Sequence, residues 1–241
     1  MKKFLTALLV LILCRGAAIA APLSVTTGAG YMKMVKELAL AYRGGGKEIS
    51  EVYGGNLGQM LAQISAGNGV NVVISDRGTL KSIKTDVKFS QTQPLGATAL
   101  VLAWRKGVEI SSPNDLASDG VKSVAYPDPK AAIYGRAASK YLENTGLGKK
   151  IAPKVSQLST VPQVFSYLVS GEMDAGFVNR VVVRAGGDKI GGSLEIPSGY
   201  PPIVMIAAVV AGEEKNEAVA DFIGFLGSAK AKAIRDKHGV R

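Results

Sequence analysis

The chain has very few of the residues on which metal sites and nucleophilic enzymes depend. Its 241 residues include one cysteine, Cys14, and one histidine, His238. These two residues leave no His–His pair and no Cys–His pair for metal binding or nucleophilic catalysis in the mature part of the chain. The G-x-S-x-G, Asp-x-Asp and His-x-x-x-His spacings are also missing. The composition therefore argues against a metal-dependent or nucleophilic enzyme.

Long apolar runs are rare as well, and the one at the start of the chain is short. Two lysines precede an apolar run over residues 4–13, and small residues follow it. About ten apolar residues fall well below the ~20 that cross a bilayer, so a retained membrane helix is the weaker interpretation. The pattern predicts a signal peptide over residues 1–20, cleaved after Ala20 or Ala21, and hence a periplasmic or secreted protein.

Cys14 has one alternative interpretation, as the lipidated first residue of a lipoprotein. The bulky Leu13 precedes it and Arg15 follows it, and both neighbours argue against lipidation. We expect Cys14 to leave with the signal peptide. The mature chain would then contain no thiol, no disulfide and no cysteine-based metal site.

Acidic residues are outnumbered by basic ones. The chain has 29 Lys and Arg against 19 Asp and Glu, a net charge of +10, and loss of the three basic residues in the signal peptide leaves 10 − 3 = +7. This excess favours anionic partners, although a basic surface unrelated to any ligand explains it equally well. The basic residues are scattered and not interleaved with aromatic side chains, so we expect no nucleic-acid partner. We also expect a monomer.

Short β-rich runs alternate with helical patterns along the rest of the chain. This alternation is typical of an α/β fold with mostly parallel sheets flanked by helices. The expected strands cover residues 23–26, 49–53, 71–75, 100–104, 123–126, 175–178 and 204–210. Apolar spacing predicts helices within residues 35–42, 57–64, 133–142, 161–169 and 218–226, with a shorter lysine-rich helix up to His238.

No internal repeat and no low-complexity linker divides the mature chain. It is long enough for one domain or for two lobes of about 100 residues each. We therefore place the crossings between lobes inside α/β structure, near residues 96–98 and 196–200. The prediction is a first lobe of residues 22–97 and 199–241 and a second lobe of residues 98–198.

Two expected strands run directly into turns of glycine and small polar residues. Thr27, Gly28 and Gly30 follow the first strand, and Gly55 and Asn56 follow the second. Unpaired N–H groups and the positive end of the macrodipole let a helix N-terminus hold an anion without a charged side chain. Turn chemistry alone is the competing explanation. The same reasoning adds the openings of two later helices, at Ala131 with Ala132 and at Thr160 with Val161.

The order and spacing of these segments resemble those of the periplasmic molybdate-binding proteins of ABC importers, a branch of the type II periplasmic binding fold. The resemblance spans nearly the whole mature chain. Its N-terminal half rests on Leu23-Ser24-Val25, Tyr53-Gly54-Gly55-Asn56, Gln63-Ile64, Gly67 and Val72-Val73-Ile74-Ser75. Its C-terminal half rests on Ala131-Ala132-Ile133-Tyr134, Val161, Gly176-Phe177-Val178, Ile196-Pro197, Tyr200-Pro201-Pro202-Ile203, Ala220-Asp221-Phe222 and Phe225-Leu226.

The resemblance implies a two-lobe protein that holds a tetrahedral oxyanion between its lobes with neutral donors. In that family a serine in each of the first two turns binds the ligand. Here the first serine position falls on Gly30, which leaves backbone amides and Thr27 as donors. The second falls nearest Asn56, and a one-residue gap would move it to Gly55 or Leu57.

The second lobe of that family contributes backbone amides at two helix starts and often a tyrosine after a late strand. Ala131 and Val161 match the two backbone positions. The tyrosine position falls on Asn179, with the basic Arg180 beside it. An asparagine offers an NH₂ donor but also a carbonyl that an oxyanion would repel, which leaves the identity of the anion open.

The expected function is capture of a small oxyanion, molybdate or tungstate, for delivery to an ABC permease in the membrane, with no cofactor and no catalysis. The same fold with sulfate, phosphate or an organic carboxylate is one alternative, and a ligand sensor is another. An exported hydrolase that uses Ser75 or Asp76 is a third. An Asp128 side chain in the cleft would favour a protonated anion over molybdate.

Overall fold

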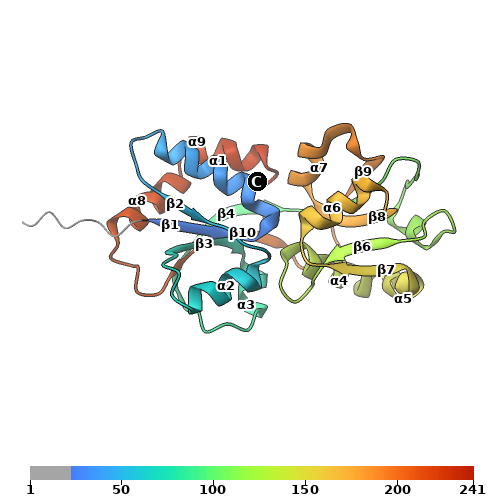
Figure 1. The fold of residues 1–241 in the computed structure, drawn as a ribbon, viewed down its shortest axis with the longest axis horizontal. Helices are drawn as coiled ribbons and strands as arrows, with labels where there is room; N and C mark the ends of the chain where they lie inside the picture. The colour runs from blue at the N-terminus through green and yellow to red at the C-terminus, as the bar shows by residue number, and fades with distance from the viewer. Residues whose placement is uncertain (1–22) are drawn as a thin grey trace, which may run out of the picture.

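In the computed structural model, which describes residues 23–241, the chain forms two five-stranded sheets side by side (Figure 1). The predicted signal peptide lies outside the described residues. The first sheet has the order β2-β1-β3-β10-β4 and the second β7-β6-β8-β5-β9. The first contains β1 (Ser24–Thr27), β2 (Ser50–Val52), β3 (Val72–Asp76), β4 (Phe89–Thr98) and β10 (Ile203–Val210). The second contains β5 (Leu100–Trp104), β6 (Val124–Pro127), β7 (Val155–Leu158), β8 (Ala175–Asn179) and β9 (Gly192–Ile196).

Each sheet has one strand that runs against the others. In the first sheet β1 pairs in parallel with β2 and β3, and β10 pairs antiparallel with both β3 and β4. In the second, β6 pairs in parallel with β7 and β8, and β5 pairs antiparallel with both β8 and β9. The reversed strands, β5 and β10, are the first strands after the chain crosses from the other sheet. The expected two-lobe α/β class with mostly parallel sheets is therefore confirmed.

The crossings between the sheets are short and lie together. One is the step from β4 to β5, and the other joins β9 to β10. The hydroxyl of Tyr200 accepts a hydrogen bond from the Leu100 N–H at 2.8 Å and donates one to the Ile196 carbonyl at 2.6 Å, so it links both crossings. The lobe limits at residues 97/98 and 198/199 stay a prediction, although the strands of each sheet fall on either side of these crossings.

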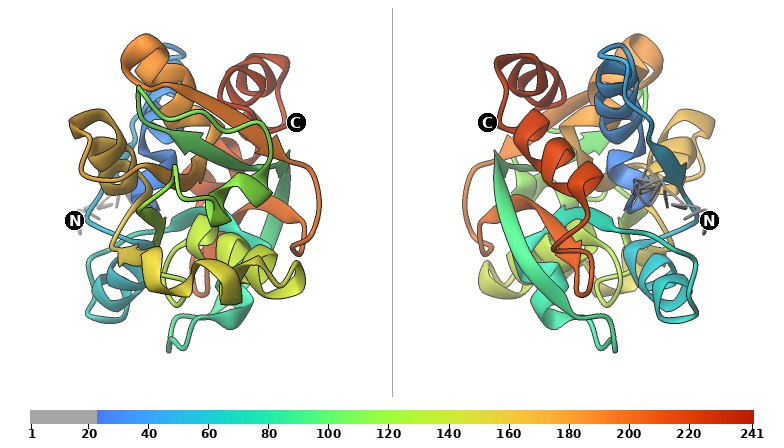
Figure 2. Two further views of the ribbon diagram at one scale, coloured as in Figure 1. Left: turned by 90° about the vertical axis from the view of Figure 1, so that its right-hand side faces the viewer. Right: turned by 90° about the vertical axis from the view of Figure 1, so that its left-hand side faces the viewer.

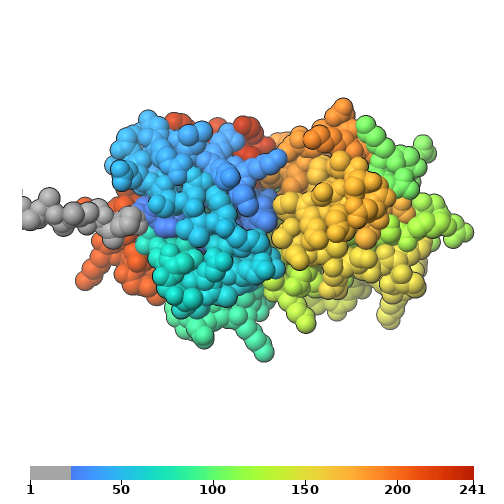
Figure 3. All heavy atoms as spheres, in the orientation of Figure 1, coloured from blue at the N-terminus to red at the C-terminus, as the bar shows by residue number. Residues whose placement is uncertain are grey.

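Helices cover both faces of each sheet (Figure 2). They are α1 (Met32–Arg43), α2 (Leu57–Ser65), α3 (Arg77–Ser82), α4 (Ile133–Asn144), α5 (Leu147–Ile151), α6 (Val161–Ser170), α7 (Arg180–Gly186), α8 (Glu217–Leu226) and α9 (Ala229–Lys237). None of these helices of residues 23–241 is long and apolar enough to cross a membrane. In the space-filling view the two lobes touch along the face shown (Figure 3). Hydrogen bonds between Tyr31 and Tyr134 and between Asn179 and Gly30 join the lobes in a closed arrangement.

The sequence-based element predictions are confirmed for seven strands, each within one residue at either end, and for six helices. The prediction missed β4, β7 and β9. All three are edge strands in the sheet order, and most of their residues are exposed or half-buried. Since an edge strand is not buried on both faces, it lacks the continuous apolar run that marks a central strand. The short helices α3, α5 and α7 were missed as well.

Candidate functional site

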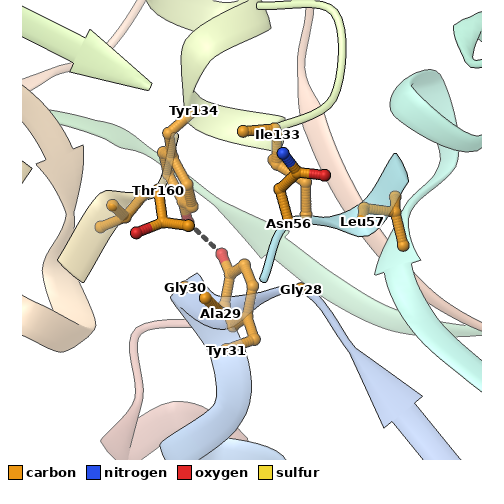
Figure 4. Close-up of a pocket in the computed structure, with 11 residues that line it drawn as sticks. Gly28, Ala29, Gly30, Tyr31, Asn56, Leu57, Ile133, Tyr134 and Thr160 are labelled. Atoms are coloured by element: carbon orange, nitrogen blue, oxygen red, sulfur yellow. Dashed lines mark hydrogen bonds between the residues drawn. The ribbon is translucent and has the colours of Figure 1, made fainter. Parts of the chain in front are cut away.

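A small cavity lies between the lobes (Figure 4). Its volume is about 30 Å³, which is room for a few water-sized groups. The first lobe lines it with Gly28, Ala29, Gly30, Tyr31, Asn56 and Leu57. The second lobe lines it with Ala132, Ile133, Tyr134, Thr160 and Val161.

Helix N-termini from both lobes converge on this cavity. The lining residues belong to a short 3₁₀ helix (Ala29–Tyr31) that leads into α1 and to the first turns or caps of α2, α4 and α6. The first N–H groups of a helix have no intrahelical acceptor, and the macrodipole makes this end positive. No Lys, Arg, His, Asp or Glu lines the cavity among the described residues. Several positive helix ends without a counter-charge favour an anion.

Asn56 is held in one orientation by a capping box. Its Oδ1 accepts a hydrogen bond from the Gln59 N–H at 3.0 Å, and Gln59 Oε1 accepts one from the Asn56 N–H at 2.8 Å. The carbonyl oxygen of Asn56 is therefore occupied by its own helix, and Figure 4 shows the amide nitrogen on the side of Ile133. This arrangement removes the repulsion expected between an oxyanion and the Asn56 carbonyl, and leaves the NH₂ group as a donor.

Thr160 is the corresponding capping residue in the second lobe. It is the N-cap of α6, and its Oγ1 accepts a hydrogen bond from the Gln163 N–H at 3.3 Å. The hydroxyl proton is not used by this cap. Gly171 ends the same helix in the left-handed conformation, with φ of 82°.

Tyr31 and Tyr134 meet across the cavity. Tyr31 lies just before α1 and Tyr134 in the first turn of α4, and their hydroxyls form a hydrogen bond that joins the two lobes (Figure 4). The Tyr134 hydroxyl also contacts Thr98 Oγ1 at 3.3 Å. Burial raises the pKa of both tyrosines well above the usual value, so both hydroxyls keep their protons near neutral pH.

Gly30 and Asn179 form a second contact between the lobes. Asn179 Nδ2 donates to the Gly30 carbonyl at 2.7 Å, and Asn179 Oδ1 accepts from the Val182 N–H at 2.9 Å as the cap of α7. Both polar groups of Asn179 are thus used, and the residue does not line the cavity. Its neighbour Arg180 is paired with Glu195 and does not line it either.

The remaining predicted site residues lie behind the lining. Thr27 is buried, and its Oγ1 has no hydrogen-bond partner among the described residues. Gly55 has a φ of +68°, and its carbonyl accepts from the Ala29 N–H at 3.1 Å, which links the two first-lobe turns. Ala131 precedes the N-cap of α4, and its N–H donates to the Asp128 carbonyl at 3.3 Å. Gly28, Gly30, Asn56 and Val161 do line the cavity.

A buried ion pair joins the lobes beside the cavity. Asp76 is fully buried at the N-terminus of α3, where its carboxylate accepts from the Gly78 and Thr79 N–H groups at 2.9 Å. Arg136 of α4 donates to both carboxylate oxygens of Asp76 at 2.8 Å and to Thr79 Oγ1 at 3.0 Å. Asp76 is therefore occupied by a helix cap and a cross-lobe arginine.

The remaining residues considered for hydrolysis or proton acceptance, Asp128 and Ser75, do not line the cavity. Asp128 Oδ1 accepts from the Lys130 N–H at 2.8 Å within a turn, and Asp128 does not line the cavity. Ser75 is fully buried and its hydroxyl has no partner in the described chain. No cluster of three His, Cys, Asp or Glu side chains within residues 23–241 forms a metal site.

Comparison with known proteins shows the family of the chain. The sequence profile described as bacterial extracellular solute-binding protein matches residues 23–241. The chain belongs to this family. It is therefore a solute-binding protein and not an enzyme. The molybdate-binding protein ModA of Rhodobacter capsulatus is 23% identical over 218 residues, with 88% of this chain and 84% of that protein covered. A putative binding protein of Haemophilus influenzae is 31% identical over 209 residues, with 83% and 82% covered.

Solved structures share the fold. The periplasmic molybdate-binding protein of Azotobacter vinelandii has a TM-score of 0.76 at 24% identity, with 91% of this chain and 98% of that chain covered. PEB3 bound to L-phospholactate has a TM-score of 0.72 at 17% identity, with 91% and 99% covered. The sulfate-binding protein SubI of Mycobacterium tuberculosis has a TM-score of 0.66 at 14% identity, with 92% and 86% covered. These matches confirm the predicted likeness to molybdate-binding proteins.

Sequence reasoning missed the residues that act across the lobes. Tyr134 was noted only as part of the resemblance, and Tyr31 and Arg136 were not considered. Tyr31 pairs with Tyr134, and Arg136 pairs with Asp76. The two members of each pair lie far apart in the sequence, so no local pattern indicates them. The one available signal for Tyr31 and Tyr134 was their place at the start of helices already assigned to the site.

Proposed function

We propose that this chain captures a small tetrahedral oxyanion, with molybdate and tungstate as the first candidates, and delivers it as the periplasmic component of an ABC importer. The observation that carries the proposal is the convergence of helix N-termini from both lobes on a cavity without charged side chains. Neutral donors stabilise a dianion through many partial charges. The lining supplies them as backbone N–H groups, the Asn56 amide and hydroxyls.

Lobe closure explains how such a protein reports occupancy. A ligand that contacts both lobes stabilises the closed arrangement over the open one. Each lobe contributes lining residues here, including Asn56 from the first and Thr160 from the second. We infer that the closed form is the one presented to the permease.

Sulfate and phosphate remain the competing ligands within the same class. Asp128, the acid whose presence in the cavity would have favoured a protonated anion, points into its own turn instead. This placement removes an acidic acceptor from the cavity, and molybdate, tungstate and sulfate are anions that need none. The names of the structural relatives include molybdate, sulfate and a phosphorylated organic acid.

The test is a thermal shift of the mature chain with molybdate, tungstate, sulfate, phosphate and small carboxylates. Ligand at about 100 times its Kd stabilises a protein by about 2.7 kcal/mol, which is several degrees in a chain of this size. A rise with oxyanions supports the proposal. No rise with any tetrahedral oxyanion would contradict it.

Asn56→Asp supplies a matched control for the site. The aspartate keeps the oxygen that caps α2, so the unliganded melting temperature should stay within about 2 °C of the parent. It replaces the NH₂ donor with a negative charge at the cavity and should abolish the oxyanion-induced shift. A variant that still responds fully to oxyanions would place the ligand elsewhere.

A further inference from the structure

Three hydroxyl groups at and beside the cavity form a chain of contacts. Among the described residues no acidic or basic side chain is hydrogen-bonded to them. Tyr31 Oη and Tyr134 Oη are hydrogen-bonded to each other, and Thr98 Oγ1 lies 3.3 Å from Tyr134 Oη. Both tyrosines line the cavity and both are about 1% exposed. Each hydroxyl has one proton and two lone pairs, so the direction of every hydrogen bond in this chain is reversible.

The two directions present different groups to a ligand. When Tyr134 donates to Tyr31, the Tyr31 proton is free to be donated to an anion. When Tyr31 donates to Tyr134, the Tyr134 proton turns toward Thr98, and Tyr31 offers the ligand a lone pair. Most of the other donors of the site, the backbone N–H groups and the Asn56 amide, have no such choice.

We propose that Tyr31 and Tyr134 are specificity-determining residues whose hydroxyl pair accepts a hydrogen bond from the protonated oxygen of hydrogen phosphate, so that the site takes inorganic phosphate as well as unprotonated oxyanions. The pair takes the place of the acidic acceptor, which this cavity lacks among its described lining residues. The inference rests on the proposed function, because it concerns the same cavity.

Sulfate and phosphate form a matched pair of probes. At about pH 8 both are tetrahedral dianions, and they differ mainly in the proton that hydrogen phosphate carries. Both tyrosine hydroxyls remain protonated there, because burial raises their pKa. A difference between the two affinities therefore reports whether the site provides an acceptor.

The experiment measures the Kd of sulfate and phosphate by calorimetry for the mature chain and for Tyr134→Phe. The parent should bind phosphate within about tenfold of sulfate. In Tyr134→Phe the Tyr31 hydroxyl can still donate to sulfate. Accepting from phosphate would leave its own proton without a partner, so phosphate affinity should fall about 10- to 100-fold more than sulfate affinity.

Thr98→Val is a second variant that preserves shape and leaves both tyrosines intact. It removes the group that receives the Tyr134 proton when the chain accepts from the ligand, so it should also weaken phosphate more than sulfate, by about threefold or more. Molybdate binding to each variant, measured in parallel, shows that the site is folded.

Three results separate this inference from the proposed function. Equal losses for sulfate and phosphate would mean that the tyrosine pair only joins the lobes, and would overturn the inference. A parent that binds molybdate, tungstate or sulfate but no phosphate would overturn it as well, with the oxyanion function retained. A parent that binds none of these anions would contradict the proposed function itself.

Discussion

Gly30 is the residue at which this chain departs most clearly from its molybdate-binding relatives as the resemblance describes them. A Cβ atom at this position would lie 3.1 Å from Asn179 Nδ2 and 3.5 Å from Val161 Cγ2. The absence of a side chain lets Asn179 reach the Gly30 carbonyl across the lobes. The serine and tyrosine of the family pattern are thus replaced together by a glycine and an asparagine that bond to each other.

Gly30→Ala should therefore disturb Asn179. We expect the melting temperature to fall by about 2–5 °C, the effect of losing roughly one hydrogen bond in a chain of this length. In the double variant with Asn179→Ala the clash is gone, so the combined loss should be smaller than the sum of the single losses by at least about 0.5 kcal/mol. Urea unfolding measures all three variants. Strictly additive losses would contradict the contact.

The site could be predicted from sequence only where its chemistry is local. Gly28, Gly30 and Asn56 were expected because they stand between a strand and a helix, and Val161 because it opens a helix. All four line the cavity. Ala131 was expected at the start of α4, where the cap is Ala132 instead, since helix ends cannot be located to one residue from sequence. The orientation of the Asn56 amide depends on the Gln59 side chain and could only be seen in the structure.

At the scale of elements, α4 and its N-cap supply three of the five second-lobe lining residues. Gly135 in its first turn packs against the end of β6, where a Cβ atom would collide with the Pro127 carbonyl and lie 2.7 Å from the Asp128 carbonyl oxygen. These obstacles are backbone atoms, which cannot rotate away. The close approach holds Ile133 and Tyr134 at the cavity.

Gly135→Ala should therefore destabilise the chain by about 1–3 kcal/mol and also weaken anion binding, because α4 must move outward. Gly224→Ala in α8 is the matched control. An added Cβ there meets no atom within 4 Å, so better helix propensity should stabilise the chain by about 0.5–1 kcal/mol. Chemical denaturation of both variants should give opposite signs. Two losses of similar size would refute the packing argument.

Asp174, just before β8, links several segments of the second lobe. Its carboxylate accepts from the Lys122 N–H at 2.6 Å, the Ser123 N–H at 3.1 Å and Arg105 Nε at 2.7 Å. Burial alone would raise its pKa. The hydrogen bonds outweigh burial, and the pKa of Asp174 lies below its usual value in the folded state.

The lowered pKa of Asp174 predicts an acid-dependent contribution to stability. The folded state binds this proton less tightly than the unfolded state, so the contribution is present above about pH 4 and is lost as the pH falls through the lowered folded pKa. Asp174→Asn should cost about 1–3 kcal/mol at pH 7 by turning an NH₂ group toward buried donors. The difference between parent and variant in melting temperature should shrink toward pH 3. A constant difference would argue against it.

Strands buried on both faces could be located from the sequence, whereas most strands at the edge of a sheet could not. The central strands β3, β5 and β8 have every residue buried, and their apolar runs located them within a residue of the structure. The edge strand β4 contains Ser90, Gln91 and Pro94, and its pairing with β10 comes from residues more than a hundred positions away. Tertiary pairing of this kind leaves little local trace.

For the molecule as a whole, the ion pair between Asp76 and Arg136 stabilises the closed arrangement without touching the cavity. The Asp76 side chain is fully buried and that of Arg136 is 17% exposed. In the closed arrangement, a buried Asp76 carboxylate without its cation would cost much free energy. In an open cleft water could reach the carboxylate and reduce that cost. The pair therefore contributes to closure whichever anion is bound.

Arg136→Met should lower the affinity for every oxyanion by the same factor, about 10- to 100-fold, because it reduces the closed population and removes no ligand contact. Small-angle scattering should show a larger radius of gyration without ligand. Lys140→Met, at an exposed position of the same helix, should change neither quantity. An effect that differs between molybdate and sulfate would instead mean that Arg136 contacts the ligand.

The Tyr200 hydroxyl holds the two crossings next to each other. It is bonded to Leu100 at one crossing and to Ile196 at the other, so both connections are fastened to a single atom. Two independent connections would let the lobes bend and twist separately. Because the shared hydroxyl holds the two connections side by side, a twist of one lobe would have to pull the connections apart, and bending both together is the easier motion. One angle between the lobes then describes the opening of the molecule.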